Sequence, residues 1–95
     1  MGNLPEISNY GEYSSSNYGA HTLRVDVGNK LTLWYSYETV IAFSDGQHRF
    51  VTENQWNVTT GKHLNWIDRG DKKSRLPYAE FTLKLENYLK ELNLL

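Results

Sequence analysis

Residues 20–27 show a two-residue alternation, the feature that most restricts how this chain can fold. Leu23, Val25 and Val27 lie on one side of an extended chain, with polar residues at the positions between them. Because successive side chains of a strand point to opposite faces, this pattern predicts a half-buried β-strand with one face on a core. The Gly-Asn pair at 28–29 readily adopts the positive φ angles of a two-residue hairpin turn, so we expect the chain to return antiparallel to its first strand.

Three further strands are predicted from the sequence up to residue 53. Residues 30–37 alternate again, and their predicted core face carries Leu31, Leu33, Tyr35 and Tyr37. Residues 39–43 are apolar and rich in β-branched side chains, and residues 48–53 follow a turn that has Asp-Gly at its centre. Because each connection is short, consecutive strands are expected to pair, and the prediction is a four-stranded antiparallel meander.

A C-terminal amphipathic helix of about 16 residues is predicted from Pro77 onward, because proline is favoured at the first position of a helix. Its apolar stripe, at spacings of three and four, comprises Phe81, Leu85, Tyr88, Leu92 and Leu95. A shorter helix over residues 62–68, capped by Thr60, is also expected. The stripe must be buried against the sheet, so the predicted fold class is α+β, an antiparallel four-stranded meander covered on one face by the C-terminal helix.

The chain of 95 residues is long enough for one domain. Residues 1–18 are rich in Asn, Ser, Gly and Tyr and have no period, so we expect a flexible N-terminal arm, followed by a single small α+β domain over residues 19–95. There is no cysteine, which excludes disulfides and thiolate metal sites. No long apolar run or secretory signal is evident, so we expect a soluble, cytoplasmic protein without contact to membranes.

Positive charge is concentrated late in the chain, although the formal net charge of the whole chain is −1. Residues 62–75 contain five basic and two acidic side chains, a net charge of +3. The basic residues are Lys62, Arg69, Lys72, Lys73 and Arg75. Such a segment favours contacts with phosphate groups, and Trp34, Tyr37 or Trp66 can stack on bases, so direct nucleic-acid binding is one hypothesis. The acidic balance of the chain as a whole argues against it.

Aromatic residues point to a protein partner. If a single helix covers the sheet on its Leu31 face, Trp34 stands on the open face, and Trp and Tyr are enriched among the residues that dominate interfaces. The alternative is that Trp34 packs beneath residues 1–18 or 55–67.

Catalytic patterns are absent from the sequence. His21, His48 and His63 share no metal-binding spacing, no serine lies in a nucleophile motif, and the glycines form no phosphate-binding loop. A metal-dependent hydrolase built from His63, Asn65, Asp68 and His48 remains a hypothesis. We expect that the protein is not an enzyme and uses no cofactor.

Three stretches of the chain resemble a family of small uncharacterised proteins from prokaryotes and their viruses. These stretches are YSYETVIAF at residues 35–43, TTGKHLNWID at 59–68, and RLP at 75–77 followed by Phe81. The resemblance covers residues 17–90. Because the family has no assigned activity, it implies no catalytic residue, but it suggests that residues 61–65 are a shared feature and that the protein belongs to a virus or mobile element.

The favoured hypothesis is a small non-enzymatic interaction module that binds and modulates a larger host protein or nucleoprotein complex. The expected partner-binding residues are Trp34, Tyr37, Lys62, His63, Trp66, Arg69, Lys72, Lys73 and Arg75. The small core and the many aromatic residues also predict a homodimer, formed through the open sheet face or through an edge strand at residues 23–27 or 48–53.

Overall fold

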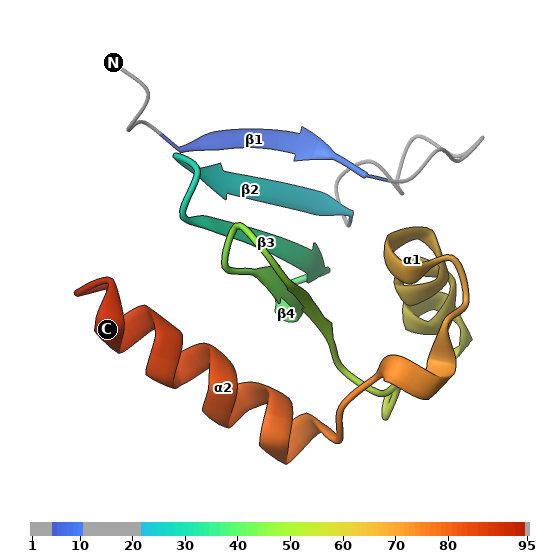
Figure 1. Ribbon diagram of the computed structural model, residues 1–95. Helices are drawn as coiled ribbons and strands as arrows, with labels where there is room; N and C mark the ends of the chain where they lie inside the picture. The colour runs from blue at the N-terminus through green and yellow to red at the C-terminus, as the bar shows by residue number, and fades with distance from the viewer. Residues whose placement is uncertain (1–4, 11–21, 95) are drawn as a thin grey trace.

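The computed structural model describes residues 5–10 and 22–94, which form one sheet and the helices that flank it (Figure 1). The elements in chain order are β1 (Glu6–Asn9), β2 (Leu23–Val27), β3 (Leu31–Ser36), β4 (Thr39–Ser44), β5 (Arg49–Val51), α1 (Val58–Asp68), the 3₁₀ turn η2 (Lys72–Ser74) and α2 (Tyr78–Glu91). The five strands pair antiparallel in sequence order. The predicted α+β class and antiparallel meander are therefore confirmed.

Strand β1 is a departure from the prediction, because residues 1–18 were expected to have no regular structure. Residues 6–9 pair with β2, and Ile7 lies opposite Val25. The following residue, Tyr10, packs against the core, and its hydroxyl donates to the Tyr35 carbonyl oxygen at 2.6 Å. The remainder of the expected arm lies outside the described residues. With β1 beside it, β2 is an inner strand and cannot pair with its own copy.

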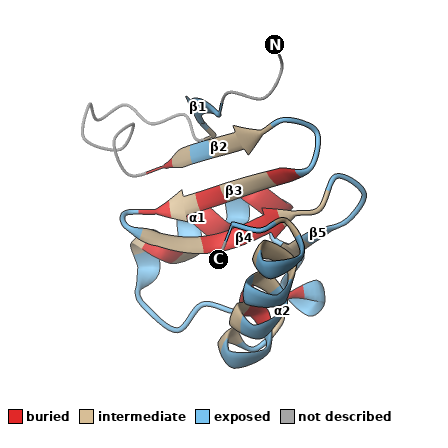
Figure 2. Cartoon of the chain, turned by 90° about the vertical axis from the view of Figure 1, so that its left-hand side faces the viewer, coloured by how far each residue is buried: buried red, intermediate tan, exposed pale blue. Residues whose placement is uncertain are grey.

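Helix α2 covers one face of the sheet, as predicted, and starts at Tyr78 directly after Pro77. Phe81 is fully buried and packs with Leu31 and Phe43. The stripe residues Leu85, Tyr88 and Leu92 pack around the same cluster. Figure 2 shows α2 on the viewer's side of the molecule, below the largely buried strands β3 and β4. The periodic spacing of the stripe thus identified both the helix and its buried face.

Helix α1 packs on the opposite face over β3, β4 and β5, so this part of the sheet carries a helix on each side and not on one (Figure 2). Its buried residues Leu64 and Ile67 pack with Trp34, Ala42 and Val51. Trp34 is 8% exposed and belongs to this core, which corrects its expected role in partner binding and confirms packing beneath residues 55–67. A bulge where the β3–β4 register shifts, between Trp34 and Tyr35, gives β4 one extra residue in this pairing.

The start of α1 lies four residues before the predicted one. Asn57 is the N-cap, and its side-chain oxygen accepts from the Thr60 N–H at 2.9 Å. Thr60, which we expected to be the cap, lies inside the helix and is buried. The last helical residue is Asp68. The C-cap Arg69 has a φ of 57°, and Gly70 follows with a φ of 84°. Within the described residues, neither α-helix has the length and apolar character needed to cross a membrane.

Candidate functional site

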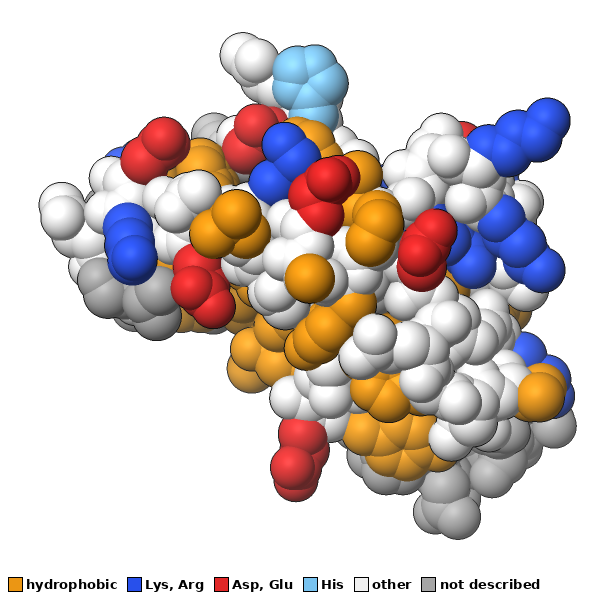
Figure 3. Space-filling model, turned by 90° about the horizontal axis from the view of Figure 1, so that it is seen from below, with side chains coloured by type: hydrophobic (Ala, Val, Ile, Leu, Met, Phe, Trp, Pro, Cys, Tyr) orange, Lys and Arg blue, Asp and Glu red, His pale blue; other side chains and the backbone are white. Residues whose placement is uncertain are grey.

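The outward face of α1 carries a hollow of about 600 Å³, lined by Lys62, Asn65, Trp66 and Arg69. These residues follow the three- and four-residue spacing of one helix face. Trp66 remains 45% exposed between the two basic side chains. Lys and Arg side chains gather at the right of Figure 3, the side on which α1 lies in Figure 1.

A second hollow of about 350 Å³ lies between α1 and η2, and Asn65 lines both hollows. We call it the Gly61 hollow, and its lining consists of Glu53, Asn54, Gly61, Asn65, Lys72 and Arg75. Lys73 is exposed beside Lys72 in η2. The fold therefore brings one group of side chains to a continuous region, the α1–η2 surface, made of Lys62, Asn65, Trp66, Arg69, Lys72 and Lys73.

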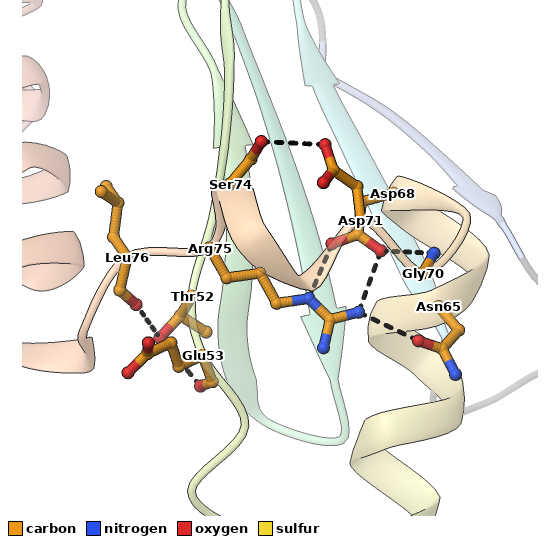
Figure 4. A network of polar contacts seen from close by, with 9 residues as sticks. All are labelled: Thr52, Glu53, Asn65, Asp68, Gly70, Asp71, Ser74, Arg75 and Leu76. Atoms are coloured by element: carbon orange, nitrogen blue, oxygen red, sulfur yellow. Dashed lines mark hydrogen bonds and ion pairs between the residues drawn. The ribbon is translucent and has the colours of Figure 1, made fainter.

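A buried ion pair holds the segment after α1 in place (Figure 4). Arg75 Nε donates to Asp68 Oδ2 at 2.7 Å, and Nη2 donates to Asp68 Oδ1 at 2.9 Å and to Asn65 Oδ1 at 3.0 Å. The two ionic side chains are only 4% and 5% exposed. Asp68 also accepts from the Gly70 N–H at 2.9 Å, which is possible because the chain turns sharply at the end of α1.

The environment of Asp68 favours its charged form. Burial by itself raises the pKa of this carboxyl, but the hydrogen bonds from Arg75 and from the Gly70 N–H, with the positive charge of Arg75, outweigh burial and lower the pKa. Asp68 is therefore ionised at neutral pH, and the charge of Arg75 is balanced within the fold. The expected role of Arg75 as a surface cation is corrected accordingly, because most of its guanidinium is committed to this pair.

His63 is, with Trp34 and Arg75, one of three predicted partner-binding residues that the structure buries, and it has no exposed surface. Its side chain lies on the inner face of α1, between the helix and β3, where its Nδ1 atom is 2.6 Å from Ser36 Oγ. The rings of Tyr10 and Tyr37 pack around it at centroid distances of 6.5 Å and 5.8 Å. A side chain in this position supports the packing of α1 on β3 and offers no surface to a macromolecular partner.

Tyr37 is exposed but lies apart from the α1–η2 surface. It occupies the β3–β4 turn with a φ of 58°, and 44% of its surface is exposed. It lines a hollow of about 170 Å³ whose other lining residues include Trp56 and Asn57. Among the residues that the structure describes, none lines both this hollow and either of the two on the α1–η2 surface.

The residues of the hydrolase hypothesis do not form a metal centre. Within residues 5–10 and 22–94, no three His, Asp or Glu side chains are grouped so that they could hold a metal ion. His63 contacts Ser36 and Asp68 contacts Arg75, whereas His48 is exposed after the β4–β5 turn.

Neither Glu53 nor Asn54, which line the Gly61 hollow, was predicted as a partner-binding residue. Glu53 was expected to end the strand over residues 48–53, and nothing local indicated that it or Asn54 would lie beside α1. Gly61 and Asn65 did carry a signal, because the family resemblance pointed to residues 61–65 as a shared feature. In the observed helix, which starts at Val58, their separation of four places both on one face.

The comparisons with curated proteins and with solved structures found no match. A family model described as "Family of unknown function (DUF8033)" matches residues 5–82, which is most of the chain. This confirms the expected membership of an uncharacterised family, although the matched range begins and ends earlier than residues 17–90. The family has no assigned activity, and β1 lies within the matched range. The chain belongs to this family of unknown function, DUF8033.

Proposed function

We propose that the protein is a non-enzymatic binding module that docks onto an acidic surface of a larger protein through the α1–η2 surface. The observation that carries the proposal is the position of Trp66, 45% exposed in an open hollow between Lys62 and Arg69. A large aromatic side chain set among cations is typical of the centre of a protein interface, where Trp and Arg contribute most of the binding energy. The cations steer an acidic partner toward it.

The backbone that carries the α1–η2 surface is held in place by core packing and by a buried ion pair. Trp66 and Lys62 project from a helix whose opposite face packs on the sheet through Leu64 and Ile67. Lys72 and Lys73 lie on a turn that the Arg75–Asp68 pair ties to the end of α1. Because these side chains are carried by ordered backbone, little conformational entropy of the backbone is lost when a partner binds.

The resemblance to proteins of prokaryotes and their viruses supports a host protein in the cytoplasm as the target. In this proposal the protein acts for a virus or mobile element by occupying a surface that the host protein needs. A second copy of the chain is not required, since the α1–η2 surface comes from a single chain.

Direct nucleic-acid binding is the second candidate, and the same four exposed cations favour it. Lys62, Arg69, Lys72 and Lys73 could each contact a phosphate group, and Trp66 could stack on a base. Two features argue against a dedicated nucleic-acid-binding protein: Glu53 lines the adjoining Gly61 hollow, and the whole chain has a formal net charge of −1.

Affinity capture with matched variants tests the proposal. The tagged protein is incubated with host lysate, with and without nuclease, beside two double variants. Lys72→Glu/Lys73→Glu reverses charge on the α1–η2 surface, and Lys30→Glu/Lys90→Glu makes the same change at exposed positions elsewhere. We expect a protein partner that survives nuclease, is retained by the control and is lost from the surface variant and from Trp66→Ala.

Two results would overturn the proposal. Retention of the partner by Trp66→Ala and by Lys72→Glu/Lys73→Glu would place the interface elsewhere. Loss of every captured component after nuclease treatment would instead favour the nucleic-acid hypothesis, and its salt dependence could then be measured with defined probes.

A further inference from the structure

Gly61 is an unexpected residue inside helix α1. Glycine within a helix is less favourable than alanine by about 1 kcal/mol, because its backbone is freer in the unfolded chain. A Cβ atom added at Gly61 would approach Asn54 Nδ2 to 3.1 Å. The missing side chain therefore keeps space between α1 and the segment after β5, and that space is part of the Gly61 hollow.

Arg75 also lines the Gly61 hollow, and one of its guanidinium nitrogens, Nη1, donates no hydrogen bond to a described residue. Its Nε and Nη2 atoms donate to Asp68 and Asn65, whereas Nη1 makes no hydrogen bond with any described residue. Figure 4 shows this amino group directed away from Asp68 and Asn65. The side chain is 4% exposed, so the guanidinium is held rigidly and its Nη1 has two N–H donors left for a ligand.

Amide donors complete the lining. Asn65 Oδ1 accepts from Arg75, which fixes the orientation of the amide and leaves its NH₂ group as a donor. Asn54 Nδ2 donates one of its two hydrogens to the Asn57 carbonyl oxygen at 3.0 Å. Lys72 adds a positive charge. The hollow thus contains several donors that suit a small anionic group with two oxygen atoms.

We propose that the Gly61 hollow receives the side-chain carboxylate of an Asp or Glu residue of the protein partner, held by Arg75 Nη1, the Asn65 amide and Lys72. This inference rests on the proposed function and names the chemistry that the α1–η2 surface recognises. The charges favour a carboxylate over a phosphate. Arg75 is paired with Asp68, and the Glu53 carboxylate lines the same hollow as Lys72, so a ligand with one negative charge meets less repulsion there than a ligand with two.

An NMR titration of the ¹⁵N-labelled protein tests the site without the partner. The probe is N-acetylglutamate N-methylamide, which presents one side-chain carboxylate, and the glutamine analogue is its neutral control. We expect saturable shifts of the Arg75 Nε–H and of the Asn54 and Asn65 amide signals, with a dissociation constant of roughly millimolar order for so small a ligand. The neutral analogue should leave these signals unchanged.

Substitutions distinguish binding of the probe in the Gly61 hollow from binding elsewhere on the protein. Gly61→Ala and Lys72→Ala should weaken probe binding by about tenfold or more. Lys30→Ala, the matched control at an exposed position outside the α1–η2 surface, should bind like the unmodified protein. Glu53→Gln should bind more tightly, because it removes a like charge. The melting temperature of Gly61→Ala should stay within about 5 °C of the parent, since alanine favours the helix while Asn54 has to shift.

Several outcomes would overturn the inference: no saturable shift, equal binding of the glutamine analogue, full binding by Gly61→Ala, or saturable binding of inorganic phosphate in place of the carboxylate. If the probe fails to bind while capture of the partner still depends on Trp66, this inference is wrong and the proposed function stands. If the probe binds but capture does not depend on Trp66, Lys72 or Lys73, the proposed function is wrong.

Discussion

Replacing Arg75 by methionine is the change from which we expect the largest loss of stability. Methionine keeps much of the apolar length of the side chain but removes two hydrogen bonds to Asp68 and one to Asn65. The Asp68 carboxylate, 5% exposed, then keeps the hydrogen bond from the Gly70 N–H and the weaker attraction of the Arg49 charge. A hydrogen bond to a charged group contributes about 1.5–3 kcal/mol, and breaking a buried ion pair costs about 3–5 kcal/mol. We expect Arg75→Met to lower the free energy of unfolding by about 3–5 kcal/mol near pH 7.

This loss should depend on pH in a direction set by Asp68. In the unmodified protein the pKa of Asp68 is lowered, so the pair contributes its full stability above the unfolded pKa of about 3.9 and loses it as the pH falls through the lower folded value. In Arg75→Met, burial without the guanidinium raises the pKa of Asp68 instead, and protonation relieves part of the penalty. The difference between the two proteins should therefore be largest near pH 7 and shrink toward about pH 4.

Urea unfolding followed by tryptophan fluorescence measures both effects. Lys72→Met, a change of an exposed cation in the adjoining turn, is the control and should alter stability by less than about 0.5 kcal/mol. The double variant Asp68→Leu/Arg75→Met should regain much of the loss, because it leaves no unpaired buried charge. A loss below about 1 kcal/mol for Arg75→Met, or a loss that is the same at both pH values, would contradict this account of the pair.

Three other changes have effects that follow from the structure and can be measured by the same unfolding assay. Trp34→Ala should cost about 3–5 kcal/mol because it opens a cavity under α1, whereas Trp66→Ala should cost under about 1 kcal/mol; equal losses would contradict the assigned burial. Asn57→Ala should cost about 1 kcal/mol by removing the side-chain cap on the Thr60 N–H, and an unchanged stability would show that the cap is unimportant. Arg69→Gly should add about 1 kcal/mol, because glycine adopts the positive φ at the end of α1 without strain, while it weakens capture of the partner; a less stable variant would mean that Arg69 makes contacts that outweigh the strain.

The elements with strong periodicity were predictable. The alternation of Leu23, Val25 and Val27 and the stripe led by Phe81 each lie on a single element, so the local pattern identifies both the element and its inner face. Strand β1 was not predictable in this way. Its four residues are all exposed and carry no apolar face, so their extended conformation depends on pairing with β2.

Part of the candidate site was likewise predictable from the sequence, and part was not. The concentration of cations in residues 62–75 and the presence of Trp66 among them were evident, and Lys62, Trp66 and Arg69 follow from helical spacing alone. The sequence could not show that Arg75 points inward. That direction depends on Asp68, seven residues earlier, which the end of α1 places within hydrogen-bonding distance.

By itself the sequence determined where the strands β2 to β5 and the long helix form, because backbone periodicity and turn residues act over a few neighbouring positions. Which side of the sheet each helix covers was decided only by the tertiary structure. Trp34 and Leu33 are adjacent in the chain, yet they face different helices, and both faces of the sheet are large enough to take one. Burial depends on the whole set of packed elements, and the gain from enclosing Trp34 under α1 exists only once β3, β4 and α1 have come together.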